Sequence, residues 1–305
     1  MTPMMEQYFK IKDQYKDHLL FYRLGDFYEM FFDDAIIASR ELELTLTGRD
    51  CGEEERAPMC GVPYHSAEGY IGRLIEKGYK VAICEQMEDP ALAKGLVTRE
   101  VIRVVTPGTL IESDLLVSGQ NNYISAVYVG IEGSGICFAD ISTAQVYATS
   151  FAGSRDEAQL INELGVYAPR EVILNVSLDK AAGLEKYLGA HKEIMVSDNQ
   201  PGRFEFAPAR ERVAAQFGDS LREDDLADKP LVCALGALMD YIAEVQKSDI
   251  SYIRDLTVYG DSQYLDMDIN TRRNLELTET MRTKEKKGTL LWVLDRTRTA
   301  PGARM

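Results

Sequence analysis

Several features are scarce or missing in this 305-residue sequence, and each absence narrows the class of protein that it can be. No apolar run approaches the roughly 18 residues that a membrane span needs. The first residues, MTPMMEQYFK, carry charge where a secretory signal carries an apolar stretch. The cysteines are odd in number and widely scattered, which is typical of reduced thiols (Cys51, Cys60, Cys84, Cys137 and Cys233). The sequence therefore predicts a cytoplasmic protein with no membrane segment.

Phosphate-binding loops are also missing. No segment reads G-x-x-x-x-G-K-[ST], and the turn from Thr106 to Thr109 lacks the lysine that such a loop uses. Gly130, Gly133 and Gly135 lie between strand-like runs, without the helix that follows a dinucleotide loop. We therefore expect no catalytic residue, no ATP hydrolysis and no cofactor in this chain.

Positive charge is also scarce. The 34 Lys and Arg residues stand against 49 Asp and Glu, a net charge of −15, whereas a general nucleic-acid binder usually has a basic balance. Residues 1–110 carry 13 basic against 19 acidic side chains, and residues 271–305 carry 9 against 4. If the first part of the chain contacts DNA, it has to do so through a local patch and through shape.

What is present indicates an α/β protein. With 45% hydrophobic residues the chain can bury roughly two cores. Its first block alternates helix and strand patterns, which predicts a small mixed α/β domain. The expected helices cover 3–16, 27 to about 40, and 67–77 with Ser66 as N-cap; the expected strands cover 19–24, 79–86 and 99–106, with a turn at Gly25-Asp26 and a loop around Gly61–His65.

A second block begins with three strand-like runs at 122–131, 135–142 and 144–152, followed by helices and a strand at 171–176. This order predicts an RNase H-like α/β domain. Beyond it, residues 263–281 and 289–299 have helical periodicity and a basic excess, which indicates the first helices of an all-α domain in a truncated chain. The predicted domains are residues 1–112, a linker at 113–122, residues 123–248, and the start of a helical core domain at 249–305.

The most informative segment, GDFYEMFF at 25–32, admits two interpretations. In the first, Asp26 and Glu29 form a capping box, and the aromatic residues form i,i+4 pairs on a core-facing helix. However, four aromatic residues in six positions cover more than one helix face, so at least one must lie outside the core. In the second, Phe27 is that exposed ring and wedges between base steps, while Glu29 hydrogen-bonds a base edge exposed by mispairing. A mismatch lowers the energy needed to kink DNA in this way.

Five further side chains are candidates for contacts with the DNA backbone: Arg49, His65, Lys94, Arg99 and Arg103. The stretch from Lys94 to Arg103 has the clearest basic excess of the first domain. Cys60 and His65 do not predict a zinc site, since no C-x-x-C pair accompanies them. Asp140 invites comparison with metal-dependent nucleases, but such a site needs several carboxylates around two cations, and the sequence does not assemble them.

A series of motifs resembles the signatures of the MutS family, in the family's order. They are TPMMEQY (2–8), LLFYRLGDFYE (19–29), APMCGVPYHS (57–66), VAICEQMEDP (81–90), VTPGTL (105–110), TRRNLEL (271–277) and LLWVLDRTRTAPGAR (290–304). The resemblance spans essentially the whole chain and is weakest over 145–230. It implies that Phe27 is the ring that stacks at a mismatch and that Glu29 is the base-contacting carboxylate.

The resemblance also implies different functions for the two domains. The first domain would recognise mismatched duplex DNA, and the second would be a connector that relays the nucleotide state and meets the MutL partner. Full-length members are homodimers and DNA-dependent ATPases that use ATP and Mg, through a region that this chain lacks. Two alternatives stay open at this point: a protein-interaction fragment with no DNA binding of its own, and a metal-dependent nuclease.

Overall fold

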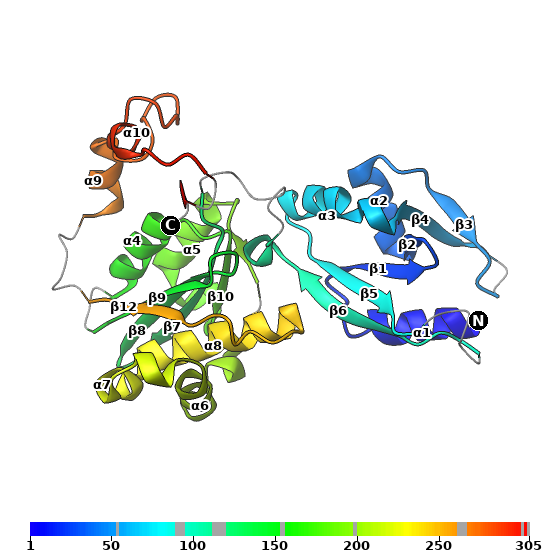
Figure 1. Ribbon diagram of the computed structural model, residues 1–305, viewed down its shortest axis with the longest axis horizontal. Coiled ribbons are helices and arrows are strands. Elements are labelled where there is room, and N and C mark those ends of the chain that lie inside the picture. The colour runs from blue at the N-terminus through cyan, green and yellow to red at the C-terminus, as the bar shows by residue number, and fades with distance from the viewer. Residues whose placement is uncertain are drawn as a thin grey trace. The chain divides into compact units, whose positions relative to one another are not determined.

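The computed structural model describes residues 1–52, 55–88, 95–111, 120–152, 156–197, 200–260, 267–299 and 302–303. The chain divides into two compact units (Figure 1). Unit 1 consists of Met1–Thr109 with Ala243–Asp249, and unit 2 of Leu110–Ile242 with Ile250–Met305. A mixed six-stranded sheet lies at the centre of each unit, so the predicted α/β class is confirmed. The domain bounds given above stay a prediction.

The sheet of unit 1 has the strand order β3-β4-β2-β1-β5-β6. Its neighbours are antiparallel except for β1 and β5, which run parallel. The elements are α1 (Pro3–Lys12), β1 (Leu19–Leu24), β2 (Phe27–Phe31), α2 (Phe32–Leu42), β3 (Thr47–Arg49), β4 (Ala57–Pro63), α3 (Ala67–Glu76), β5 (Val81–Gln86) and β6 (Arg99–Val105), with short 3-10 turns at Tyr64–Ser66 and Pro107–Thr109.

The helix predicted to begin at Phe27 is wrong over its first five residues, which form strand β2. Gly25-Asp26 is the two-residue loop of a hairpin between β1 and β2, as the turn prediction required, and Gly25 has a φ of 58°. Pairing with β1 on one side and β4 on the other fixes residues 27–31 as extended chain. The helix starts only at Phe32, and no capping box between Asp26 and Glu29 exists.

The loop predicted around Gly61 is also wrong, because β4 continues through Gly61 to Pro63. Strand β3 was not predicted, since TGR is too short to carry a pattern. Helix α3 lies where it was expected, but the Ser66 side chain makes no capping hydrogen bond to it.

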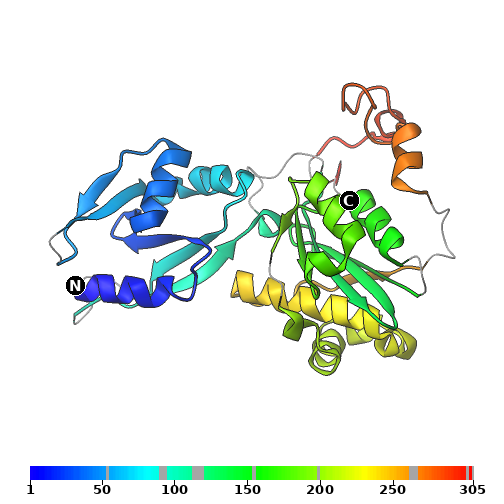
Figure 2. The ribbon, with the colours of Figure 1, turned by 180° about the vertical axis from the view of Figure 1, so that it is seen from behind.

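Helices lie on both faces of this sheet. Helices α2 and α3 lie on one face and α1 on the other (Figures 1 and 2). Cys60 of β4 contacts the Ala35 carbonyl oxygen of α2 through its Sγ, at 3.4 Å. On the opposite face the Tyr8 ring of α1 packs edge-on against Phe31 of β2, with centroids 5.2 Å apart. Alternate residues of a strand point to opposite faces. The residues of β2 on the same side as Phe31 therefore point to the face of the sheet that α1 covers.

The sheet of unit 2 has the order β11-β10-β7-β8-β9-β12. Strands β7, β8 and β9 form an antiparallel meander, and β10, β11 and β12 add parallel strands at its edges, as predicted for an RNase H-like domain. The strands are β7 (Tyr123–Gly130), β8 (Gly133–Asp140), β9 (Gln145–Phe151), β10 (Glu171–Leu174), β11 (Met195–Val196) and β12 (Asp255–Val258). Strand β12 joins this sheet although it follows residue 248, where the sequence predicts the second domain to end.

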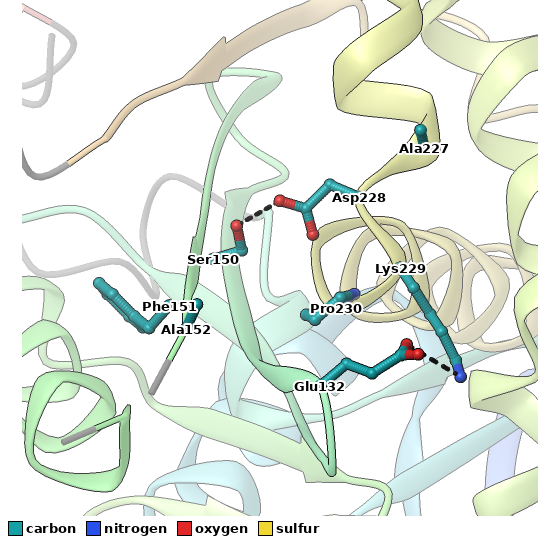
Figure 3. Close-up of a pocket in the computed structure, with 8 residues that line it drawn as sticks. All are labelled: Glu132, Ser150, Phe151, Ala152, Ala227, Asp228, Lys229 and Pro230. Atoms are coloured by element: carbon teal, nitrogen blue, oxygen red, sulfur yellow. Dashed lines mark hydrogen bonds and ion pairs between the residues drawn. The ribbon is translucent and has the colours of Figure 1, made fainter. Parts of the chain in front are cut away.

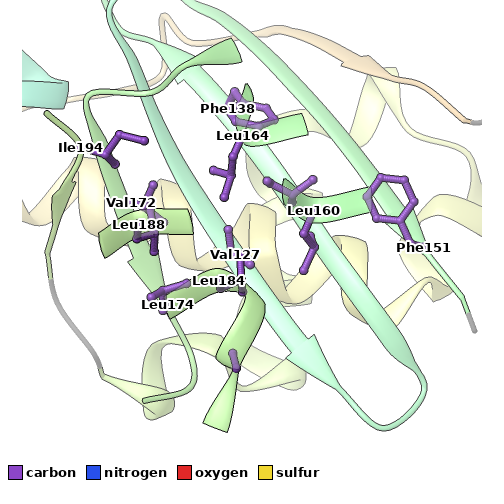
Figure 4. Close-up of a cluster of buried hydrophobic side chains, with 12 residues drawn as sticks. Val127, Phe138, Phe151, Leu160, Leu164, Val172, Leu174, Leu184, Leu188 and Ile194 are labelled. Atoms are coloured by element: carbon purple, nitrogen blue, oxygen red, sulfur yellow. The ribbon is translucent and has the colours of Figure 1, made fainter. Parts of the chain in front are cut away.

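One face of this sheet is covered by α4 (Asp156–Tyr167) and α5 (Ala182–Ala190). Each helix contributes two leucines at i,i+4 spacing to a buried cluster with Phe138 and Val172 of the sheet (Figure 4). Leu160 and Leu164 come from α4, and Leu184 and Leu188 from α5. Burial of such side chains contributes about 1.5–3 kcal/mol each.

Helices α6 (Phe206–Phe217), α7 (Glu223–Ala227) and α8 (Lys229–Gln246), the last as far as Ile242, complete the unit on its other face. The first turn of α8 approaches β8 so closely that a Cβ atom on Gly135 would lie 2.1 Å from the Pro230 carbonyl oxygen. Glycine is therefore required there by packing.

After β12 the described chain contains only short helices, α9 (Ile269–Asn274) and α10 (Leu290–Leu294). The predicted helical stretches at 263–281 and 289–299 are thus wrong in length from residue 267 onward, and residues 263–266 lie outside the described residues. Side chains from Leu290 to Leu294 are all exposed, so no packing supports a longer helix within the described residues. No helix in the described part of the chain is long and apolar enough to cross a membrane.

Candidate nucleic-acid interface

Phe27 and Glu29 leave the same face of the sheet, because they are two residues apart on strand β2. The Phe27 ring is 46% exposed at the start of the strand, whereas Phe31, at the other end, is fully buried. Tyr28 and Met30 point to the other face and are buried. The strand therefore presents one exposed ring and one carboxylate side by side.

Strand β4 supplies the neighbours of both residues. Phe27 pairs with Pro63, and Glu29 pairs with Gly61. Gly61 leaves little room beside Glu29, since a Cβ atom there would lie 3.4 Å from Glu29 Cγ and 3.2 Å from the Tyr28 carbonyl oxygen. The Glu29 side chain thus lies against β4 at a position where the facing residue has no side chain.

Arg49, on strand β3, reaches the same face and contacts Glu29. Its Nη1 donates to Glu29 Oε2 at 2.5 Å. The two side chains are 39% and 16% exposed, so the ion pair is only partly open to water. The structure therefore brings together two residues that the sequence singled out separately, 20 positions apart.

A second cluster holds the hairpin loop next to Phe27. The Arg23 guanidinium lies 3.5 Å from the centre of the Tyr64 ring, and its Nε donates to the Gly25 carbonyl oxygen at 2.5 Å. Arg23 Nη1 also pairs with Glu85 at 3.3 Å. The Tyr64 amide donates to the Asp26 carbonyl oxygen at 2.9 Å. These contacts tie the Gly25-Asp26 loop to the strands behind it, and they leave Tyr64 43% exposed beside the loop.

Tyr28 anchors this loop from the opposite face of the sheet, where α2 and α3 lie. Its hydroxyl donates to Glu85, and burial, followed by the hydrogen bond to Glu85, raises the pKa of the Tyr28 phenol well above its usual range. The phenol therefore stays protonated and remains a donor at any physiological pH.

The remaining predicted contacts lie in different surroundings. His65 is exposed, edge-on to Tyr64. Arg99 is 7% exposed and donates to Gln7 and to the Arg23 and Val97 carbonyl oxygens. Arg103 is half-buried and donates to the Thr109 carbonyl oxygen at 3.3 Å. Lys94 lies outside the described residues.

Sequence reasoning missed Gly61, Arg23 and Tyr64 as parts of this site. The motif at 57–66 contains Gly61 and Tyr64, but interpreting it as a loop hid the pairing with β2. Arg23 stands in the predicted strand 19–24, where an arginine among apolar residues was the available signal.

Asp140 has a structural task. It is fully buried, and its carboxylate accepts hydrogen bonds from the Asn122 amide and from both the amide and the hydroxyl of Ser142. It thereby fixes the turn after β8, which is a common use of aspartate. Within the described residues, no group of three or more His, Cys, Asp or Glu side chains is arranged to hold a metal ion.

Unit 2 contains a hollow of about 300 Å³ beside the start of α8 (Figure 3). Ser150 donates to Asp228 at 2.5 Å, and Lys229 pairs with Glu132 at 3.3 Å. Asp228 also accepts from the Leu231 amide at the start of the helix. These contacts stabilise the start of the helix and the adjoining strands, and we assign no ligand to the hollow.

Comparison with known sequences agrees with the architecture. The family descriptions MutS domain I, MutS domain II and MutS domain III match residues 2–114, 122–254 and 270–305. All three describe parts of one class of DNA mismatch repair protein, in chain order. The chain belongs to the MutS family.

Curated relatives carry the same family name along the whole chain. The DNA mismatch repair protein MutS of Acetivibrio thermocellus is 49% identical over 304 residues, and that of Alkaliphilus oremlandii is 50% identical over 310. Each match covers 100% of this chain and 35% of the relative. The protein of Clostridium tetani is 47% identical, with 34% of its length covered. The chain thus spans about a third of the length of these relatives.

Proposed function

We propose that this chain recognises mispaired or unpaired bases in duplex DNA, as part of mismatch repair. The observation that carries the proposal is the exposed Phe27 ring at a hairpin, with the Glu29 carboxylate beside it on the same face. A half-exposed aromatic ring can supply a large contact area to a partner surface. Family membership supplies the partner: the relatives are named DNA mismatch repair proteins.

In this proposal Phe27 enters the minor groove and stacks between base steps at the mispair. Such insertion unstacks the step and kinks the duplex, at an expense of a few kcal/mol. A mismatched site is already weakly paired, so it kinks more easily than matched DNA, and the wedge reads that difference. The hairpin loop held by Arg23 and Tyr64 keeps the ring in place.

Glu29 supplies a hydrogen bond to the displaced base. A carboxylate is repelled by phosphates, so it favours binding only where it can accept a hydrogen bond from a base edge that mispairing exposes. Its position two residues from Phe27 on the same face supports this role.

Contacts with the DNA backbone are proposed for His65, beside the hairpin, and for Lys94. Arg99 and Arg103 have less surface to offer a phosphate, because each already donates to carbonyl oxygens of unit 1. With a net charge of −15 and few cations on this face, we expect weak, salt-sensitive binding by this chain.

The second unit is proposed to act as a connector that relays to MutL. Its RNase H-like fold and the match to MutS domain II support that assignment. For a protein as long as these relatives, we propose a cytoplasmic homodimer that hydrolyses ATP with Mg. The acidic balance also fits a module that binds proteins without DNA, and capture of MutL in the absence of DNA would favour that function.

The test is equilibrium binding of this chain to a duplex with one central G·T mispair and to its G·C control, at low salt. We expect tighter binding to the mispaired duplex, and we expect Phe27→Ala to remove the difference while leaving matched-duplex binding unchanged. Equal binding of both duplexes by the unchanged protein would contradict the proposed function. Discrimination that survives Phe27→Ala would contradict the role of Phe27.

A further inference from the structure

The ion pair between Glu29 and Arg49 carries an inference about how the carboxylate is held. Arg49 comes from β3, and Glu29 from β2, with β4 between them in the sheet. Arg49 pairs with Ala57 and Glu29 with Gly61, four residues apart along β4, so the two side chains approach each other diagonally across that strand. A contact of 2.5 Å between them requires both side chains to extend toward each other over β4.

Such a contact restricts Glu29 strongly. A glutamate side chain that is free in water loses rotamer entropy when a ligand fixes it. Pairing with Arg49 removes most of that freedom before any DNA arrives, because the guanidinium offers donors in a planar, fixed arrangement. The absence of a side chain on Gly61 keeps the path of Glu29 over β4 open.

The pair also changes the charge that this face presents. An isolated carboxylate at a DNA-binding surface is repelled by every phosphate in reach, matched or mismatched. With Arg49 at 2.5 Å, the local charge near Glu29 is close to zero, while one carboxylate oxygen, Oε1, is not the atom that Arg49 contacts. Oε1 is thus the oxygen that can accept a hydrogen bond from a base.

We infer that Arg49 is a positioning residue for Glu29, which it orients and neutralises so that the carboxylate can accept a hydrogen bond from a mispaired base. The inference rests on the proposed function of Glu29 as the base-contacting residue. It differs from a simple phosphate contact by Arg49, because its effect is carried through Glu29 and is specific to mispaired DNA.

A double-mutant cycle separates the two roles. For each variant, the affinity for the G·T duplex is divided by that for the G·C duplex, at two salt concentrations. We expect Arg49→Ala to lower this ratio about tenfold with the salt dependence unchanged. In a Glu29→Ala background the same substitution should change the ratio less than twofold, since the residue through which Arg49 acts is gone.

The opposite pattern would overturn the inference. If Arg49 contacts a phosphate directly, Arg49→Ala weakens both duplexes equally and lowers the slope of log affinity against log salt by about 0.9. Its effect then adds to that of Glu29→Ala. Either of these results removes the positioning role.

Two further variants guard against trivial explanations. Arg40→Ala removes another arginine paired with a carboxylate, but from α2 on the opposite face, and should leave the ratio unchanged. Gly61→Ala keeps both charges but crowds Glu29, and it should lower the ratio while circular dichroism shows the fold intact. A Gly61→Ala protein that discriminates normally would contradict the account.

Failure of the inference is distinguishable from failure of the proposed function. If the unchanged protein binds both duplexes equally, the proposed function is wrong. If it discriminates and Phe27→Ala abolishes that, but Arg49→Ala alters neither the ratio nor the coupling with Glu29, only the positioning role is wrong.

Discussion

Phe27 and Phe31 leave the same face of the same strand, yet Phe27 is 46% exposed and Phe31 is fully buried. Phe31 packs edge-on against Tyr8 and Tyr22, with ring centroids 5.2 and 6.4 Å apart. Phe27 lies at the hairpin end of the strand, where its ring is partly exposed. The same face of β2 is therefore part of the hydrophobic core at the Phe31 end and part of the protein surface at the Phe27 end.

This difference predicts unequal effects on stability. We expect Phe31→Ala to lower the free energy of unfolding of unit 1 by about 3–5 kcal/mol, the usual range for a buried phenylalanine. Phe27→Ala should lower it by less than about 1 kcal/mol, because the ring is half in solvent. Urea unfolding followed by circular dichroism measures both. A Phe27→Ala effect as large as that of Phe31→Ala would identify Phe27 as a core residue.

In unit 2, one glycine has no room for a side chain and another has open space, so their substitution by alanine should affect stability differently. Gly135→Ala should destabilise the unit by more than about 2 kcal/mol, because the added methyl would meet the Pro230 carbonyl oxygen at 2.1 Å and force α8 away from the sheet. Gly189→Ala, in helix α5, meets nothing within 4 Å and should be neutral or stabilise by up to about 1 kcal/mol. Thermal unfolding followed by circular dichroism compares them. Equal midpoints for the two variants would refute the close packing of α8.

His18 predicts a pH dependence for unit 1. Burial, followed by the charges of Lys80 and Lys12, lowers the pKa of its imidazole from 6.5 to about 4, and the charges of Asp17 and Glu244 oppose this only in part. The folded protein thus favours the neutral ring. Its contribution to stability is fully present above pH 6.5 and is lost as the pH falls from there toward 4. We expect the loss to be about 2 kcal/mol after solvent screening is allowed for.

The check is to compare the protein with a His18→Phe variant between pH 7.5 and 4. The Nδ1 atom of His18 is buried and makes no hydrogen bond to the described residues, so the phenyl ring removes the titration without removing a bond. The stability difference between the two proteins should shift in favour of the variant by about 2 kcal/mol across that range. Parallel pH curves would show that His18 does not titrate in the folded state.

Much of the fold follows from the sequence, and the failures have a common physical cause. The strands 19–24, 79–86 and 99–106 and the meander of unit 2 were predictable, because their apolar runs are bounded by turn residues. Residues 27–31 were not, since their aromatic residues satisfy helical and strand periods equally. The choice is made by hydrogen bonds to β4, which lies some thirty residues away.

The candidate site shows the same limit. Phe27 and Glu29 were identifiable from their motif, but their shared face follows from the strand. The contact between Arg49 and Glu29 depends on the order β3-β4-β2, which no local pattern contains. Arg99 appeared in the sequence as one basic residue among others, and only the packing of α1 and β1 around it shows that its guanidinium is buried.

The most direct test of the wedge is the fluorescence of 2-aminopurine placed next to a G·T mispair, with a high concentration of this chain at low salt. 2-Aminopurine brightens when its base step unstacks, which is what insertion of Phe27 would cause. The account predicts an increase for the mispaired duplex, none for the matched duplex, and none for Phe27→Ala with either. An equal increase with Phe27→Ala, or with the matched duplex, would contradict the claim that this ring reads the mismatch.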